Sequence, residues 1–149
     1  TEAESSFNPK ATSHIPAYGL MQLVPKSGAR DAYNYVYKKD KYLNKNYLYN
    51  PKNNIELGCA YLAKLRYHYF KSIVDNNNAY LCTIAAYNTG AGNVARALTN
   101  TTKLKPTAKV ANSMSQKKLY NKLVQDLEYD ETRNYLKKVW KKKNDYQNI

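Results

Sequence analysis

The segment ESSFNPKATS, residues 4–13, gathers an acid, an aromatic ring and several hydroxyl groups near one end of the chain. Cleavage of a glycosidic bond requires a carboxylic acid that stays protonated near neutral pH, and an apolar environment favours this by disfavouring the anion. Glu4 lies close to Phe7 and could face a hydrophobic core, with Phe7 as part of its apolar housing. Glu2 would point to another face of a helix. We therefore consider Glu4 as a candidate general acid.

Other carboxylates compete with Glu4 for this role. Most carboxylates in proteins are solvated, and several rivals have evident structural tasks at helix ends. Spacing alone therefore leaves open whether Glu4 is catalytic or a surface acid. The rivals are Glu56, Asp75, Glu128, Asp130 and Glu131.

Serine, metal and phosphate chemistry find little support in the sequence. A serine hydrolase needs a histidine that an acid orients. Of the two histidines, His14 adjoins Ser13, where side chains diverge, and His68 lies on the surface of a predicted helix. No paired-histidine spacing or glycine-rich phosphate loop is present. We therefore expect no metal and no cofactor.

Apolar residues recur every three or four positions over residues 53–69, which predicts an amphipathic helix. Asn53 is expected to cap it, with Glu56 completing a capping box and Ile55 and Cys59 on the apolar stripe. Residues 76–78 are expected to break this pattern. Residues 80–87 are almost wholly apolar and predict a helix that is buried all round and ends at Gly90.

The remaining segments predict further helices and loops. Residues 92–98 are expected to form a short helix, and residues 103–109 are expected to form a loop around Pro106. Ser115 is expected to cap a helix that runs to about residue 127. A last helix begins near Asp130, with acids at its start and five lysines towards its end, both favourable to the helix dipole. Residues 14–52 are predicted to be mostly helix and loop. Without a convincing strand pattern, the fold class is mainly α.

Composition limits the choice of partner without deciding it. The chain has 149 residues, the length of one domain. Its 16 tyrosines against 2 phenylalanines suit a wet, sugar-accepting groove. A net charge of +13 favours nucleic acid, anionic lipid or an acidic cell-wall polymer, although the lysine runs are equally compatible with a solvated helix face. Cys59 and Cys82 could form one bridge or remain two thiols.

Five blocks follow one another in the chain: ESSFNPKATS, YGLMQLVPKSG, YNPKNNIELGCAYLAKL, AAYNTGAGNV and ETRNYLKKV. Together they resemble the lytic transglycosylases of bacterial peptidoglycan, and more narrowly their membrane-bound C-type branch. The resemblance implies a goose-type-lysozyme-like helical domain with a substrate groove over residues 1–149, truncated at its N-terminus. It also implies a location in the bacterial periplasm or cell envelope, with an outer-membrane association through an N-terminal anchor outside this chain.

The resemblance also assigns roles to individual residues. It implies that Glu4 is the single catalytic acid and that Tyr87 and Tyr135 lie close to it and hold or polarise it. For substrate binding it implies that Ser13 lies near the N-acetyl group and that Gln22 lies in the sugar groove. The implied site residues are Glu4, Tyr87 and Tyr135 for catalysis and Ser13, Met21, Gln22 and Asn88 for substrate binding. Ile15 and Pro16 depart from the family pattern.

The implied reaction cleaves the β-1,4 bond between N-acetylmuramic acid and N-acetylglucosamine with assistance from the N-acetyl group, and it forms a 1,6-anhydro product. The implied partner is the peptidoglycan glycan strand, bound by a monomer. Its carboxylates suit the positive charge. A non-catalytic wall-binding module, a hydrolytic lysozyme and a basic nucleic-acid binder are the alternatives. The last is disfavoured, because the tyrosines have helix-core spacing rather than that of a stacking strip, so we expect no nucleic-acid partner.

Overall fold

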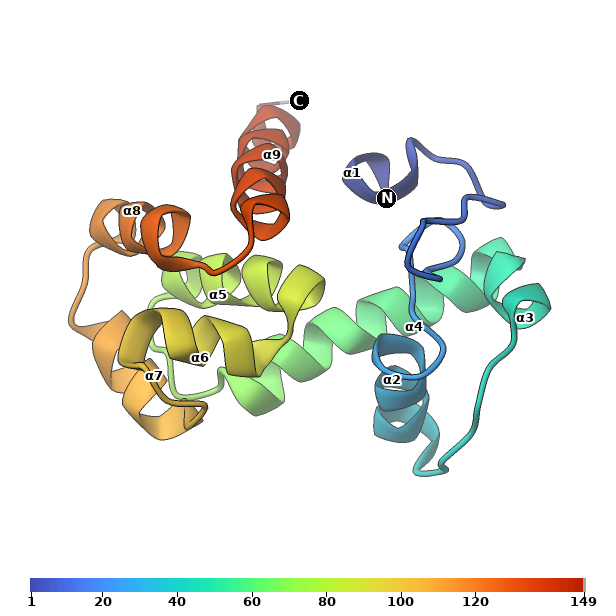
Figure 1. The fold of residues 1–149 in the computed structure, drawn as a ribbon, viewed down its shortest axis with the longest axis horizontal. Coiled ribbons are helices and arrows are strands. Elements are labelled where there is room, and N and C mark those ends of the chain that lie inside the picture. Colours follow the sequence, from blue (N-terminus) through green and yellow to red (C-terminus); the bar gives the residue numbers. More distant parts are fainter. Residues whose placement is uncertain (149) are drawn as a thin grey trace. The chain divides into compact units, whose positions relative to one another are not determined.

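The computed structural model describes residues 1–148, and the regular elements in this part of the chain are all helices (Figure 1). Isolated antiparallel bridges join Tyr18 to Thr12 and to Leu23. The predicted mainly α class is therefore confirmed. The chain forms two compact units, Thr1–Lys64 and the residues from Leu65 onward. We call them unit 1 and unit 2 and describe each by itself.

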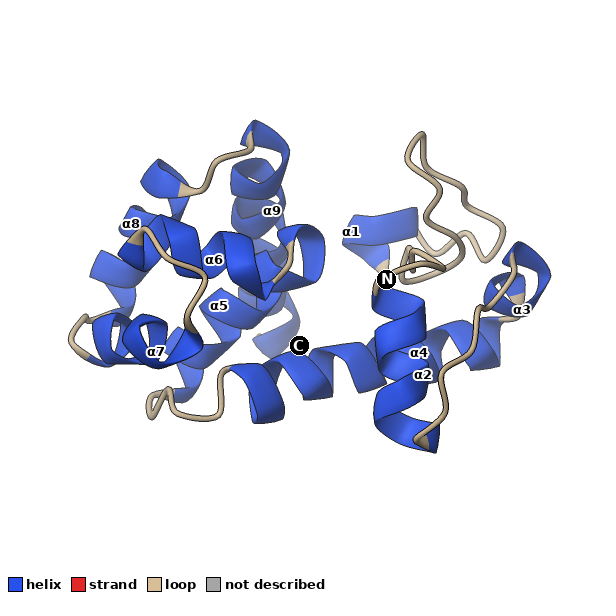
Figure 2. Cartoon of the chain, turned by 60° about the horizontal axis from the view of Figure 1, so that its bottom comes forward, coloured by secondary structure: helices blue, strands red, loops and turns tan. Residues whose placement is uncertain are grey.

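Unit 1 holds helices α1 (Glu2–Ser5), α2 (Gly28–Tyr37), α3 (Lys45–Tyr49) and α4 (Pro51–Lys64). Helix α4 packs against α2 and α3, and Leu43, Leu48 and Leu57 are almost fully buried. A long loop, tan in Figure 2, connects α1 to α2. The prediction of helix and loop over residues 14–52 is confirmed.

Helix α4 begins at Pro51, two residues before the predicted cap at Asn53. Proline suits the first helical position, where a backbone N–H would have no partner within the helix. The side chain of Asn50 accepts a hydrogen bond from the Asn53 backbone N–H at 3.1 Å. Glu56 accepts instead from the hydroxyl of Tyr37, and this bond raises the pKa of Tyr37 to about 12. The predicted capping box is therefore wrong.

The buried face of α4 also differs from the predicted stripe. Ile55 is 42% exposed and Cys59 is exposed, whereas Leu57 and Gly58 are buried. The difference arises because the polar side chain of Asn54 points into the core, where it bonds to backbone groups. A pattern based on apolar residues assigns such an asparagine to the surface.

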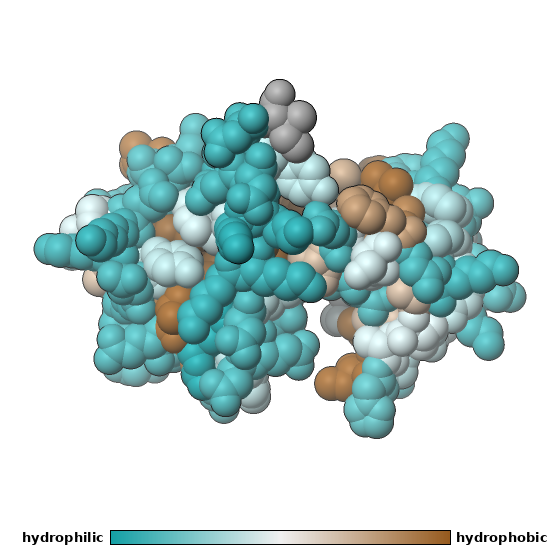
Figure 3. Space-filling view, turned by 90° about the horizontal axis from the view of Figure 1, so that it is seen from above, coloured by the Kyte–Doolittle hydropathy of each residue, from teal (hydrophilic) through white to brown (hydrophobic). Residues whose placement is uncertain are grey.

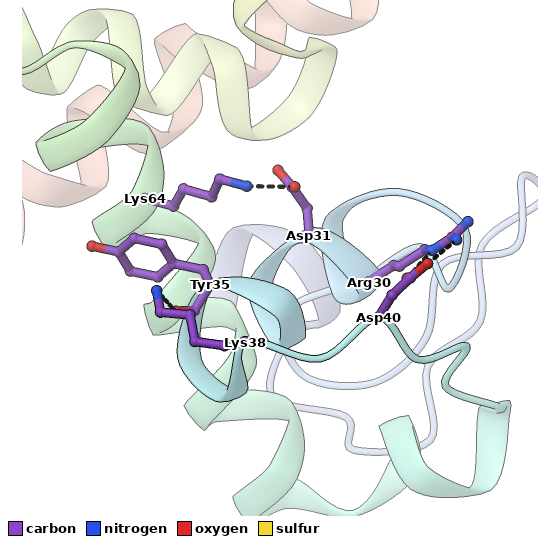
Figure 4. Close-up of polar contacts among 6 residues, drawn as sticks. All are labelled: Arg30, Asp31, Tyr35, Lys38, Asp40 and Lys64. Atoms are coloured by element: carbon purple, nitrogen blue, oxygen red, sulfur yellow. Dashed lines mark hydrogen bonds and ion pairs between the residues drawn. The ribbon is translucent and has the colours of Figure 1, made fainter.

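Charged side chains surround α2 in unit 1 (Figure 4). Arg30 pairs with Asp40 beyond the end of the helix, and this hydrogen-bonded pair lowers the pKa of the Asp40 carboxyl. Lys64 of α4 pairs with Asp31 at 2.5 Å. Such pairs near the surface contribute little to stability, because water and salt screen the charges.

Unit 2 contains the π-helical segment η1 (Leu65–Tyr69) and five α-helices within the described residues. Helix α5 packs against η1 and against each of the other helices of the unit, and six of its apolar residues are buried. The prediction that this helix ends at Gly90 is confirmed, but burial all round is wrong at Tyr80, whose side chain is 39% exposed. The helices are α5 (Asn76–Thr89), α6 (Ala91–Thr99), α7 (Leu104–Asn112), α8 (Gln116–Asp126) and α9 (Asp130–Gln147).

Two predictions for unit 2 are wrong. Residues 76–78 start α5 rather than interrupt a helix, because the side chain of Asp75 caps the backbone N–H of Asn78 at 2.8 Å. Residues 104–112 form α7, although a loop was expected over residues 103–109. Pro106 is tolerated because it lies in the first turn, where backbone N–H groups have no helical acceptor.

The predicted starts of the other helices of unit 2 are confirmed. Helix α6 covers the predicted short helix, and the side chain of Ser115 caps α8 by accepting from the Lys118 backbone N–H at 3.3 Å. Helix α9 begins at Asp130, as expected, but continues to Gln147, so that its last turn contains no basic residue. The lysines therefore lie inside α9 rather than at its end.

In the view of Figure 3, hydrophilic residues cover most of the surface, and hydrophobic residues reach it in small patches. Among the described residues, no helix has both the length and the apolar character needed to cross a bilayer.

Candidate active site

Glu4 lies on α1, a helix of only four residues, and its side chain is half-buried. Such a short helix is not stable on its own. The hydroxyl of Ser5 donates a hydrogen bond to the carbonyl oxygen of Leu20 at 2.8 Å, which ties α1 to the loop between α1 and α2. The position of Glu4 in unit 1 therefore depends on that loop.

Phe7 does not provide the apolar housing that the sequence suggested. Its side chain is 57% exposed. Ser6 and Phe7 both have left-handed backbone conformations, with φ of 49° and 64°. These two residues turn the chain directly after α1, so that the ring of Phe7 points away from the core. The prediction that Phe7 forms part of the apolar housing of Glu4 is therefore wrong.

Gln22 occupies a left-handed position in the loop, with φ of 49°. Its Nε2 donates hydrogen bonds to the carbonyl oxygens of Gly19 at 2.9 Å and Ala11 at 3.1 Å. Because both bonds are made by Nε2, the orientation of the amide is fixed. Its Oε1 makes no hydrogen bond within the described residues and can accept one from a ligand hydroxyl or amide.

Asn54 anchors this loop from α4, and its side chain is fully buried. Its Oδ1 accepts from the backbone N–H of Met21 at 2.7 Å, and its Nδ2 donates to the carbonyl oxygens of Tyr18 at 2.8 Å and Leu48 at 2.7 Å. These bonds satisfy backbone groups that the loop would otherwise bury without partners. Asn54 thus holds the segment that carries Met21 and Gln22.

Met21 is mostly a packing residue, with 8% of its surface exposed. A Cβ atom placed on Gly58 would lie only 2.2 Å from the Met21 sulfur atom. The glycine in α4 therefore leaves the space that this side chain occupies. Only a small part of Met21 can reach a ligand.

Ser13 lies in a tight loop and is exposed. Its hydroxyl accepts from the backbone N–H of Ala17 at 3.1 Å and donates to the carbonyl oxygen of Ile15. The hydroxyl is therefore held by the loop, and a substrate contact would have to replace the bond to Ile15.

Unit 2 carries the other predicted site residues. Tyr87 and Asn88 lie in the last turn of α5, and Tyr135 lies on α9, which packs against α5. All three are half-buried. The hydroxyl of Thr132, one turn before Tyr135, donates to Asn88 Oδ1 at 2.7 Å. This bond fixes the amide of Asn88 and leaves its Nδ2 as a donor for a ligand.

The predicted site residues are divided between the units. Glu4, Ser13, Met21 and Gln22 belong to unit 1, and Tyr87, Asn88 and Tyr135 belong to unit 2. Within unit 1, α1 and the loop of Gln22 are joined through Ser5. Within unit 2, the end of α5 and α9 are joined through Thr132. No group of three or more metal-ligating side chains lies together among residues 1–148.

Sequence reasoning missed three residues that position the candidates: Ser5, Asn54 and Thr132. Ser5 follows Glu4 directly, and Thr132 lies on α9 one turn before Tyr135. Asn54 gave a detectable signal, because it is a polar residue between the apolar positions of a strongly predicted helix. A buried asparagine requires partners, and those partners lie in a remote loop that local periodicity does not reveal.

The family model described as Transglycosylase SLT domain matches residues 1–110. The match includes Glu4, the loop that carries Gln22, and the end of α5 with Tyr87 and Asn88. The chain therefore belongs to the transglycosylase SLT domain family. The resemblance stated from the five sequence blocks is confirmed.

The individual relatives are membrane-bound lytic murein transglycosylases C from several bacteria. The protein of Glaesserella parasuis is 37% identical over 99% of this chain and 40% of its own length. Those of Klebsiella pneumoniae and Sodalis glossinidius are 40% and 38% identical, each over 93% of this chain and 38% of the relative. The chain thus spans about two fifths of the length of these relatives.

Proposed function

We propose that this chain is the catalytic domain of a peptidoglycan lytic transglycosylase. It would cleave the β-1,4 bond between N-acetylmuramic acid and N-acetylglucosamine and form 1,6-anhydro-N-acetylmuramic acid. The observation that carries the proposal is the family match over residues 1–110, which includes Glu4 and the loop to which its helix is tied. The names of the relatives, all lytic murein transglycosylases, support the same reaction.

In this mechanism, Glu4 donates its proton to the glycosidic oxygen, and the bond between that oxygen and C1 of the muramic sugar breaks. The N-acetyl oxygen of the same sugar stabilises the positive charge at C1. Glu4, now a carboxylate, accepts the proton of the 6-hydroxyl group of the muramic sugar. The oxygen of that hydroxyl group bonds to C1 and closes the 1,6-anhydro ring. The reaction consumes no water and returns Glu4 to its protonated form.

A single carboxyl group is sufficient for this route. Retaining and inverting hydrolases generally use a second carboxylate, and the matching sequence blocks supply none with such a role. Assistance by the N-acetyl group takes its place. The proposed mechanism therefore requires residues that orient the N-acetyl group more than it requires another acid.

Asn88 and Gln22 are suited to orient the sugar because their amides are fixed. Asn88 Nδ2 would donate to the N-acetyl carbonyl oxygen, since Thr132 already uses Asn88 Oδ1. Gln22 Oε1 would accept from a sugar hydroxyl or amide. Ser13 would contact the N-acetyl group by exchanging its bond to the Ile15 carbonyl.

Tyr87 and Tyr135 would hold or polarise Glu4 and the developing positive charge. Met21 would add a small apolar contact to the sugar, because most of its side chain packs against Gly58. These roles, together with that of Glu4, complete the proposed site.

The proposed partner is the peptidoglycan glycan strand, and the proposed location is the bacterial cell envelope or periplasm. We also propose that the protein is a monomer, and analytical ultracentrifugation would test this. An outer-membrane association through a segment outside this chain is also part of the proposal, and the relatives are named membrane-bound.

Digestion of purified sacculi tests the reaction, with mass spectrometry of the released muropeptides. The proposal expects 1,6-anhydro products, which weigh one water less than the products of hydrolysis. Hydrated muropeptides would contradict it in favour of a lysozyme. Binding to sacculi without any release would indicate a non-catalytic module.

Glu4→Gln tests the acid, and Glu2→Gln is its matched control on the same four-residue helix. Loss of the general acid should reduce turnover by at least about 10²-fold, the lower end of such effects. The control should keep most of its activity. Comparable loss in both variants would point to disruption of α1 rather than to a catalytic role of Glu4.

A further inference from the structure

The sequence of α9 contains five lysines among residues 137–143. Four of them, Lys137, Lys138, Lys141 and Lys142, fall within an arc of about 140° when successive residues are placed about 100° apart. We call these four the lysine face of α9. The buried residues Thr132 and Leu136 lie on the opposite side of the helix, so the lysine face points away from the core of unit 2.

The helix itself gains little from this arrangement. The stabilising effect of cations on the helix dipole is confined to the last turn, and the last turn of α9 contains no basic residue. The face also places Lys137 four residues before Lys141, and Lys138 four residues before Lys142. Like charges at this spacing destabilise a helix. Neither the dipole nor local pairing within the face therefore explains the lysines.

Within the described residues, Lys137 and Lys141 are exposed and make no ion pair or hydrogen bond. The acid Asp130 on the same helix pairs with Arg133 instead. Two cations of the face are therefore available to an external anion.

We infer that the lysine face of α9 binds the carboxylate groups of the peptides that peptidoglycan strands carry, and so retains the protein on its polymer. This inference rests on the proposed function for the identity of the polymer. Each exposed lysine contributes only a weak, salt-sensitive contact. A polymer with repeated carboxylates can engage several lysines at once, and linked weak contacts give a much stronger association than each alone.

An anionic membrane fits this helix less well. A helix that lies in a membrane interface buries an apolar face in the lipid, whereas α9 packs its buried residues within unit 2, against α5 and α8. Within the described part of α9, the one strongly exposed large hydrophobic residue is Tyr146. A hydrated polyanion that requires only charge is the better partner.

Binding to sacculi tests the inference, with the Glu4→Gln background used to prevent digestion. The test variant is Lys137→Gln/Lys138→Gln/Lys141→Gln. The matched control is Lys103→Gln/Lys105→Gln/Lys109→Gln, which removes the same charge from exposed positions at α7. We expect binding at low salt to weaken about five- to tenfold in the test variant and less than about twofold in the control. Circular dichroism melting curves should show both variants folded.

Sacculi from which an amidase has removed the peptides identify the ligand. The test variant and the background protein should bind this stripped polymer equally. Equal weakening of test and control variants would attribute the effect to net charge, and an undiminished test variant would leave the lysine face without a role. Either result overturns the inference, as does equal dependence on the lysines for stripped and intact sacculi.

Vesicles that contain phosphatidylglycerol provide the lipid comparison. Lysine-dependent binding to these vesicles but not to sacculi would also overturn the inference, in favour of a membrane partner. The reaction is measured separately, with Glu4 intact. Release of anhydro-muropeptides without lysine-dependent binding would support the proposed function and contradict the inference. Lysine-dependent binding without release would support the inference and contradict the proposed function.

Discussion

The side chain of Asn54, fully buried on α4, accepts a hydrogen bond from the backbone N–H of Met21 at a distance of 2.7 Å. This contact joins the long helix of unit 1 to the loop that presents Gln22. In the same loop, the carbonyl oxygen of Leu20 accepts a hydrogen bond from the hydroxyl of Ser5, the neighbour of Glu4. The placement of Glu4 and Gln22 within unit 1 therefore depends on one asparagine that contacts neither side chain by a hydrogen bond.

Replacement of Asn54 by leucine should destabilise the protein by about 2–4 kcal/mol. Leucine has a similar volume, but it leaves one buried backbone N–H and two buried carbonyl groups without their partner, and each such loss costs about 1–3 kcal/mol before relaxation. Urea denaturation followed by circular dichroism measures the change. Asn53→Leu is the control, because the Asn53 side chain donates a single long bond of 3.4 Å to Tyr47. A similar loss in both variants would argue against a special role of Asn54.

Gly19 lies in the same loop with φ of +80°, and a Cβ atom there would approach Asn54 Nδ2 to 2.3 Å and the Leu48 carbonyl oxygen to 2.4 Å. Gly19→Ala should therefore cost at least about 2 kcal/mol, from backbone strain and from displacement of Asn54. The same denaturation experiment measures it.

Gly92→Ala is the matched control for Gly19→Ala. A Cβ atom on Gly92 would meet only the Thr102 methyl group at 3.8 Å, and alanine is preferred over glycine inside a helix by about 0.5–1 kcal/mol. We expect this variant to be unchanged or slightly more stable. If Gly19→Ala were equally harmless, the tight packing of the loop on Asn54 would be refuted.

The boundaries of the later helices could be predicted because local signals determine them. Ser115 caps α8 through its own side chain, and Gly90 ends α5 where a positive φ is needed. The start of α7 could not be predicted in this way, because Pro106 was interpreted as a helix breaker although it lies in the first turn. Position within a helix decides the effect of a proline, and the sequence alone did not provide that position.

The candidate site was predictable to a different extent. The sequence blocks gave the residues that we propose to carry the chemistry, but not the contacts that hold them. The side chains of Ser5, Asn54 and Thr132 each bond to a partner that is distant in the chain, at separations of 15, 33 and 44 residues respectively. Such contacts arise from tertiary packing, and no pattern of neighbouring residues encodes them. The exposure of Phe7 has a local origin instead, since it follows from the two consecutive left-handed residues Ser6 and Phe7, which the pattern of apolar residues does not reveal.

The two cysteines should react differently with a thiol reagent. Both are free in the structure, with Cys59 exposed and Cys82 buried. Burial raises the pKa of the Cys82 thiol well above its ordinary value, to about 12. Because the reactive species is the thiolate, native protein at pH 8 should be labelled rapidly at Cys59 alone, and denatured protein at both positions. Cys59→Ser should show no rapid labelling, whereas the absence of any thiol after denaturation would reveal a disulfide.

The raised pKa of Cys82 also gives a pH dependence of stability. The unfolded thiol ionises above pH 9 while the folded thiol remains protonated to about pH 12. The contribution of this group to stability is therefore fully present below pH 9 and is lost as the pH rises towards 12. Cys82→Ala should remove this part of the alkaline loss of stability, which denaturation curves at pH 8, 9 and 10 would measure against the parent protein.

Thr132→Val tests whether the orientation of Asn88 matters for the proposed reaction. Valine matches the shape of threonine but cannot donate the 2.7 Å hydrogen bond to Asn88 Oδ1, so the amide of Asn88 should be free to rotate. If Asn88 Nδ2 orients the N-acetyl group in the transition state, release of anhydro-muropeptides should fall up to about tenfold, the equivalent of one hydrogen bond of about 1 kcal/mol or slightly more. Stability should change by about 1 kcal/mol. Thr132→Ser retains the hydroxyl and should keep most of the activity, whereas equal activity in the valine and serine variants would show that the reaction does not depend on this hydrogen bond.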